Sequence, residues 1–275
     1  MARLERTSAG SGAAGACGSS IPFGERAIDM ALPGGGLARG ALHEAMGAGP
    51  ETEHAASAGR FLAGVVARAM RPTGAMRPGA AEPANWVIWI ADEPPFLPAL
   101  AECGIDAARL LFARARGLDV LQTMEDALQS GAMTSVVGEL DANLSLTASR
   151  RLQLAAEASG TLALLLRRSR KFDDPGLCNA SAAATRWRIG SVPSAAPIAS
   201  RPGLRGLGPA RWQVELLRSR RGGTGSWLVE ASDAQGRLRL VTDVPDRPVA
   251  TPWPDPARID HRRIDRRRGE YHRAG

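Results

Sequence analysis

The sequence predicts an α/β fold, in which a mostly parallel sheet is flanked by helices and continues into antiparallel strands at its C-terminal end. Short apolar, β-prone runs alternate with helical periodicity between residues 41 and 166. Parallel strands joined in this way need crossover helices, which cover both faces of the sheet. After residue 184 the strands become longer and two of them are joined by a short hairpin-type loop. With 44% hydrophobic and 23% charged residues in 275, the composition is typical of one globular domain.

The first predicted elements are two helices and a strand. Residues 25–31 have the spacing of a short amphipathic helix, and residues 41–45 are an apolar run that predicts a strand. Residues 57–70 (SAGRFLAGVVARAM) place their apolar side chains on one face at helical spacing. Pro72 is expected to end this second helix.

Three apolar runs predict the interior strands of the sheet: residues 86–90 (WVIWI), 135–137 and 161–166 (TLALLL). Helical periodicity predicts the helices between them, over residues 118–130 and 147–159. A further helical signal covers residues 97–103, and an extended one covers residues 105–111. On the helix over 147–159, the side chains expected to be buried are Leu152, Leu154, Ala155 and Ala158.

The C-terminal part predicts antiparallel strands over residues 185–192, 211–219 and 225–232, the last two joined by a hairpin loop. The ends of the chain have a different composition. Residues 1–20 are rich in Ala, Gly and Ser and are expected to be a flexible leader, and residues 244–275 are expected to be a basic, disordered tail. The folded domain is therefore expected to cover residues 21–243.

Several protein classes are excluded by simple counts. Apolar runs are far shorter than the roughly 20 residues that cross a bilayer, and the start lacks the apolar run of a secretory signal. We therefore expect a cytoplasmic protein with no membrane contact. Cys17, Cys103 and Cys178 are far apart, and the four histidines have no metal-ligand spacing, so neither a disulfide nor a metal site is predicted.

The net charge of +7 is distributed unevenly. Residues 1–166 hold 13 Arg and 17 Asp or Glu, whereas residues 167–221 hold 11 Arg and one Lys against three acidic residues. Such a basic block indicates a polyanion or an acidic partner.

Three stretches in order resemble the RecA-like family. They are IPFGERAIDMALPGGGLARGALHEAMG, WVIWIADE and the long run from DALQSGAMTSVVGEL to TLALLLRRSR. The likeness covers about residues 21–240 and is most specific for the ImuA group, accessory proteins of a bacterial DNA-damage mutagenesis cassette. It implies a RecA-like core and places Glu93 at the position of that family's catalytic glutamate.

The motifs that bind nucleotide in this family are degenerate here. A Walker A loop, GxxxxGK[ST], cradles phosphate with its amides and lysine. In the corresponding stretch Gly49 echoes the family, but Gly59 and Arg60 stand where glycine and lysine belong, and no hydroxyl residue follows. The Walker B strand runs into Gly138 instead of an aspartate, with Glu139 next. We therefore expect no ATPase activity and no cofactor, and we interpret Glu93 and Glu139 as vestigial acidic positions.

By the same resemblance, the basic segment lies where RecA has a mobile DNA-contacting loop. Its first charges are Arg167, Arg168, Arg170 and Lys171, and the C-terminal hairpin adds Arg218, Arg220 and Arg221. Guanidinium groups pair with phosphates and stack on unpaired bases, so these residues are predicted to contact single-stranded DNA or a protein partner.

The resemblance implies a non-catalytic adaptor in SOS-induced translesion synthesis. Its implied partners are ImuB, RecA and the error-prone, DNA polymerase III alpha-type subunit. Two alternatives stay open at this point: a DNA-dependent ATPase that uses an unconventional loop around Arg60, and a cell-division inhibitor similar to SulA.

Overall fold

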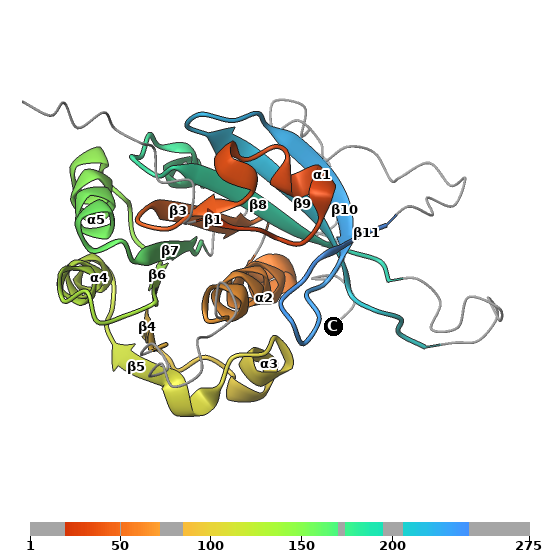
Figure 1. The fold of residues 1–275 in the computed structure, drawn as a ribbon, viewed down its shortest axis with the longest axis horizontal. Helices are drawn as coiled ribbons and strands as arrows, with labels where there is room; N and C mark the ends of the chain where they lie inside the picture. Colours follow the sequence, from red (N-terminus) through yellow and green to blue (C-terminus); the bar gives the residue numbers. More distant parts are fainter. Residues whose placement is uncertain (1–19, 50, 72–84, 170–173, 195–205, 242–275) are drawn as a thin grey trace, which may run out of the picture. The chain divides into compact units, whose positions relative to one another are not determined.

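We describe the chain from a computed structural model, shown as a ribbon in Figure 1. The structure describes residues 20–241 except 50, 72–84, 170–173 and 195–205. The chain divides into two compact units, Met1–Leu240 and Val241–Gly275, and the account below concerns the first. The expected leader, apart from Ser20, and the expected tail lie outside the described residues.

The first unit is built on a nine-stranded sheet with the order β11-β10-β9-β8-β3-β7-β6-β4-β5. Neighbouring strands from β8 to β5 are parallel, and those from β8 to β11 are antiparallel. This confirms the predicted α/β class with its C-terminal antiparallel extension. The strands are β3 (Leu42–Gly47), β4 (Val87–Ala91), β5 (Leu110–Arg114), β6 (Ser135–Leu140), β7 (Leu162–Arg167), β8 (Thr185–Val192), β9 (Arg211–Ser219), β10 (Gly225–Glu230) and β11 (Arg239–Leu240).

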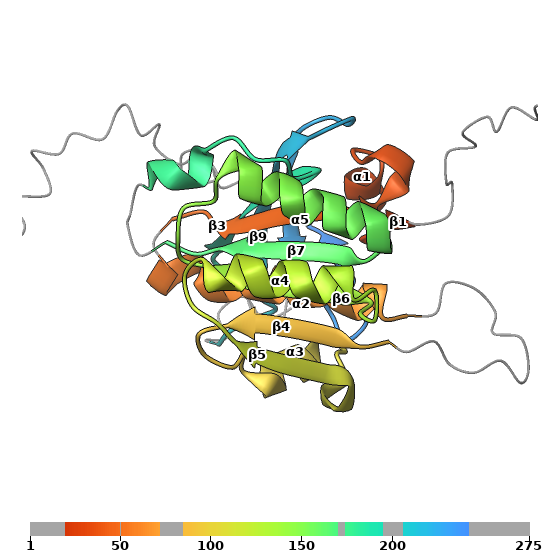
Figure 2. The ribbon, with the colours of Figure 1, turned by 90° about the vertical axis from the view of Figure 1, so that its left-hand side faces the viewer.

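Helices cover both faces of this sheet. Figures 1 and 2 show α4 and α5 side by side on one face, with α2 on the other. The α-helices are α1 (Arg26–Asp29), α2 (Glu51–Ala69), α3 (Leu97–Glu102), α4 (Asp119–Gln129) and α5 (Leu146–Ser159). A separate two-stranded ribbon joins β1 (Ser20–Ile21) to β2 (Leu37–Ala38), and short 3₁₀ turns cover Pro33–Gly35, Ala107–Arg109 and Pro175–Cys178. Within the part of the chain that the structure describes, no helix is both long and apolar enough to cross a membrane.

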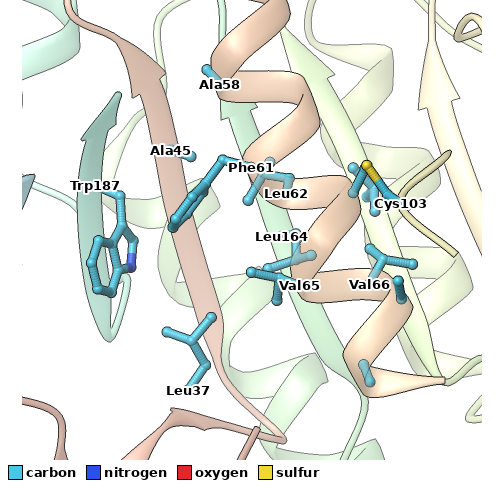
Figure 3. Packing of buried hydrophobic residues seen from close by; sticks show 14 of the residues in the cluster. Leu37, Ala45, Ala58, Phe61, Leu62, Val65, Val66, Cys103, Leu164 and Trp187 are labelled. Carbon is cyan, nitrogen blue, oxygen red and sulfur yellow. The ribbon is translucent and has the colours of Figure 1, made fainter. Parts of the chain in front are cut away.

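The larger of two hydrophobic clusters lies between α2 and the sheet. Figure 3 shows Phe61, Leu62 and Val65 of α2 directed toward Leu164 of β7 and Trp187 of β8. These α2 positions repeat every three or four residues, so one face of the helix is apolar and packs on the strands. Burial of this face fixes α2 against the central strands, next to the stretch predicted to be a degenerate nucleotide loop.

The second cluster lies between the sheet and the pair α4 and α5, with Met124, Leu128 and Leu152 buried in it. Gly138 of β6 faces this cluster, and a Cβ there would clash with Met124 Sδ. Glycine is therefore required at this position by close helix packing.

Several details differ from the sequence prediction, including the position of β5, which begins at Leu110 and not at residue 105, and the following features of α2 and α5. Helix α2 begins at Glu51, six residues before its expected start. On α5, Leu154 is 64% exposed and Ala158 is exposed, whereas Gln153 is buried because its Oε1 accepts a hydrogen bond from the Leu42 amide at 3.0 Å. The helix is thus rotated slightly relative to the expected apolar face.

Candidate functional site

The connection between β3 and α2 is where a RecA-like protein would hold triphosphate. It consists of residues 48–50, since β3 ends at Gly47 and α2 begins at Glu51. Gly49 lies in this connection, but Gly59 and Arg60 lie more than two turns inside α2. The three residues predicted as a degenerate nucleotide loop therefore do not form one loop, because the polar stretch after Glu51 is helical.

Neither Gly59 nor Arg60 is directed at a phosphate position. A Cβ on Gly59 would contact Leu166 Cδ2 of β7 at 3.9 Å, so this glycine faces the sheet. Arg60 Nη1 instead pairs with Glu102 Oε2 of α3 at 3.0 Å. The guanidinium that stands in for the Walker lysine in the sequence is thus used for a helix-helix contact.

The space beside the connection is almost filled. The cavity there measures about 20 Å³ and is lined by residues including Gly47, Gly49, Ala58 and Arg167. This is room for about one water molecule, whereas small-molecule sites measure about 300–1,000 Å³. His54 closes the N-terminal part of α2 onto the sheet, because its Nδ1 accepts the Ser191 amide at 3.0 Å.

Arg167, predicted to contact DNA or a partner, is instead part of a buried ion network. Its side chain is only 2% exposed, and its Nη1 lies 3.8 Å from Glu44 Oε2. The same carboxylate oxygen accepts a hydrogen bond from Arg186 Nε at 3.0 Å. Burial lowers the pKa of Arg167 from its ordinary value. Arg167 is therefore not at the surface, where a contact with DNA or a partner was expected, because β7 extends through this residue and buries it.

Glu44 was missed by the sequence analysis. It is fully buried in β3, between β7 and β8, where it is paired in register with Leu165 and Arg186. A carboxylate in the middle of the apolar run ALHEAM was the available signal, because a buried charge requires a partner.

The two glutamates interpreted in the sequence as vestigial acidic positions lie at one end of the sheet. Glu139 and Glu93 both line a cleft of about 390 Å³, together with Arg168. Glu139 is fully engaged: its Oε1 accepts from Trp89 Nε1 at 2.7 Å, and its Oε2 accepts from Arg168 Nε at 2.6 Å. Glu93 is exposed, in the segment after β4. Of these two glutamates, Glu139 is thus neutralised by an arginine and Glu93 faces solvent.

Asp92 in this cleft is also paired with arginine. The guanidinium of Arg116 hydrogen-bonds the Asp92 carboxylate and holds the pKa of that carboxyl below its usual range. Among the residues that the structure describes, no group of three or more His, Cys, Asp and Glu side chains is arranged to hold a metal ion.

Many arginines of the basic segment, residues 167–221, pair with glutamates on strands of the sheet. Besides the contacts of Arg167, pairs with glutamates of the sheet include Arg168–Glu139, Arg186–Glu44, Arg188–Glu215 and Arg211–Glu230, and Arg220 lies 4.0 Å from Glu157 of α5. Arg170 and Lys171 lie outside the described residues. These ion pairs therefore account for part of the positive charge from which a polyanion or an acidic partner was predicted.

The hairpin arginines remain at the surface. Arg218, Arg220 and Arg221 are exposed around the end of β9. Arg218 Nη1 donates to the Ser181 carbonyl at 2.7 Å, and Arg220 Nη2 donates to the Ala182 carbonyl at 2.5 Å. The structure thus brings these three predicted residues together, on the same side as α5 and away from Glu93 and Glu139.

Comparison with known proteins identifies the family. No family model matches the chain. The chain is 39% identical over 239 residues to Protein ImuA of Caulobacter vibrioides strain NA1000 / CB15N. The aligned region covers 84% of this chain and 92% of the relative. The same values hold for Protein ImuA of Caulobacter vibrioides strain ATCC 19089 / CIP 103742 / CB 15. With this identity along nearly the whole length, the chain belongs to the ImuA family.

Proposed function

We propose that the chain is a non-catalytic adaptor in DNA-damage-induced translesion synthesis, which assembles ImuB, RecA and an error-prone polymerase. The observation that carries the proposal is the 20 Å³ cavity at the β3–α2 connection. Phosphoryl transfer depends on a cradle of amides, a cation and a metal ligand around the triphosphate. Here the connection is three residues long, and the nearby Arg167 is bound by Glu44.

The edge of the sheet formed by β5 supports a role in assembly. Strand β5 is the last strand and pairs only with β4 among the described residues. Leu111 and Phe112 on it are exposed, and Phe96 nearby is 73% exposed. An unpaired edge with exposed apolar side chains is a template for strand addition by a partner. We assign this edge to RecA, because RecA-like folds associate by docking a strand or an apolar residue on a neighbour.

The exposed hairpin arginines favour single-stranded DNA as a second ligand. Arg218, Arg220 and Arg221 lie within four residues of each other and keep guanidinium donors beyond those bound to carbonyls. Contacts to phosphates would make binding depend on salt.

The adaptor role is tested by capture of purified partners. Immobilised full-length chain should retain ImuB and RecA, and Phe112→Glu should lose RecA while keeping ImuB. Leu207→Glu is the matched control, because Leu207 is 91% exposed and lies outside β5. A wild-type chain that retains neither partner would refute the adaptor role.

The enzymatic alternative is tested by titration of Mg²⁺-ATP. We expect no saturable binding up to about 1 mM, a level that corresponds to about −4 kcal/mol. Saturable binding that Arg60→Ala abolishes would overturn the non-catalytic adaptor role and favour the ATPase alternative. Overexpression separates the SulA-like alternative: filamentous cells with an unchanged damage-induced mutation rate would establish division inhibition.

A further inference from the structure

A groove runs along the outer side of α5, toward the end of β9. It has a volume of about 580 Å³ and continues into a second hollow of about 280 Å³ that shares Gln153, Glu157 and Arg220 with it. We call the two together the α5 groove. Its lining includes Leu146, Arg150, Leu154, Ala180, Ala182 and Arg218 in the first part, and Arg39 and Arg221 in the second.

The α5 groove has a strong excess of positive charge. Five of its lining residues are arginines, at positions 39, 150, 218, 220 and 221, and its only carboxylate is Glu157. Glu157 already accepts a hydrogen bond from Gln153 Nε2 at 2.8 Å and lies 4.0 Å from Arg220 Nη1. One carboxylate cannot neutralise five guanidinium groups, so the groove favours an anionic occupant.

Two of these arginines are held in place by the backbone opposite them. Arg218 and Arg220 donate to the carbonyls of Ser181 and Ala182, which fixes their guanidinium groups along the segment before β8. A guanidinium has five N–H donors, so donors remain for a carboxylate. Because these side chains are already ordered, less conformational entropy is lost when a ligand binds.

Apolar side chains lie beside these charges. Leu146, Arg150 and Leu154 follow each other at four-residue spacing along α5, so they form one stripe on the helix. Both leucines are exposed, and Leu154 is exposed to 64%. A ligand that covers the stripe would bury two leucines and place anionic groups next to Arg150, Arg218 and Arg220.

We propose that the α5 groove binds an acidic amphipathic helix of a protein partner. This proposal rests on the adaptor function and specifies the chemistry of one docking segment. Apolar residues of the helix would pack on Leu146 and Leu154, and its carboxylates would pair with the arginines on either side. Single-stranded DNA, the second ligand proposed above, would compete for Arg218, Arg220 and Arg221. The helix fits the groove better, because no Phe, Tyr or Trp lines it and the ring of His43 is buried, so bases would find no stacking surface.

The test uses a synthetic probe and the full-length chain. The probe is a fluorescein-labelled 20-residue peptide of Leu, Ala and Glu, with leucines spaced as on one face of a helix and glutamates on both sides. We expect saturable binding by fluorescence anisotropy, and a loss of at least about tenfold in affinity in both Leu154→Glu and Arg150→Glu. Leu207→Glu and Arg26→Glu are matched controls on exposed residues outside the groove, expected to bind within about twofold of wild type.

Three outcomes would overturn the proposal. They are no saturable binding by the wild-type chain, equal binding of the same peptide with lysine in place of glutamate, and unchanged binding by the groove variants. An oligonucleotide, dT20, is the further arm: if it binds and loses affinity in Arg150→Glu while the peptide does not, the groove belongs to nucleic acid. The peptide assay contains neither ImuB nor RecA, so its failure is distinct from a failure of the capture experiment.

Discussion

Removal of the Glu44 carboxylate should destabilise the fold more than removal of any partly exposed glutamate. In Glu44→Ala, Arg167 and Arg186 lose the carboxylate that lies 3.8 Å and 3.0 Å from their nitrogens. All three side chains are at least nine-tenths buried, so two positive charges would remain in a region of low dielectric. Breaking a buried pair in this way costs about 3–5 kcal/mol.

Urea unfolding followed by circular dichroism measures this cost. With an m-value of about 3 kcal/mol/M, the midpoint should fall by roughly 1–1.7 M. The matched control is Glu215→Ala, which removes the partly exposed partner of Arg188 and should cost no more than about 1 kcal/mol.

A second variant separates charge from packing. Replacing Glu44, Arg167 and Arg186 together by apolar residues of similar volume should recover most of the lost stability, because no charge then remains buried. If Glu44→Ala were no less stable than Glu215→Ala, the buried network would not contribute as argued.

The remaining predictions concern packing, pH and DNA. Gly138→Ala should lower the free energy of unfolding, measured in urea, by about 1–3 kcal/mol, because its Cβ would clash with Met124. Gly223→Ala, with no atom within 4 Å of its Cβ, should change it by about 0.5 kcal/mol at most. Equal changes would contradict the packing argument. Burial lowers the pKa of His43 to about 4 from 6.5. As the pH falls, His43 is therefore protonated in the unfolded chain at a higher pH than in the folded chain. This difference should lower the free energy of unfolding by roughly 3 kcal/mol between pH 6.5 and pH 4. His43→Gln should flatten that dependence, and a slope identical to wild type would count against it. If the chain binds single-stranded DNA, the triple substitution of Arg218, Arg220 and Arg221 by alanine should lower the salt slope by about 2, at roughly 0.7 for each phosphate that is no longer neutralised. Arg167→Ala should lower stability and leave that slope unchanged, and a reduced slope would show that this residue contacts phosphate.

The order of the helices and strands could be predicted because each one has its own local pattern of apolar and polar residues. The strand bounds expected over residues 185–192 and 211–219 are those of β8 and β9. The early start of α2 was missed because its first turns, ETEHAA, are polar and resemble a loop. Acidic residues are in fact favoured at a helix N-terminus, where they face the positive end of the helix dipole.

The candidate site was harder to predict because its contacts are long-range. Arg167 follows a clear strand run and precedes other basic residues, so the local sequence resembles a basic loop. Its partner, Glu44, lies more than a hundred residues earlier and meets it only because β3 and β7 are neighbours in the sheet. The exposure of Leu154 was also not predicted. A rotation of α5 by one residue position is enough to place Gln153 in the core and Leu154 at the surface.

The shortness of the β3–α2 connection limits which mutations could create a nucleotide-binding loop in this fold. A phosphate-binding loop of the Walker type spans eight residues, so point mutations at Gly59 or Arg60 would add a lysine or a hydroxyl within an existing helix. A Walker-type loop at this connection would require an insertion that displaces the start of that helix, together with the release of a buried arginine. If the proposed non-catalytic role holds, single substitutions are therefore expected to change the surfaces of this fold more readily than they create a nucleotide site.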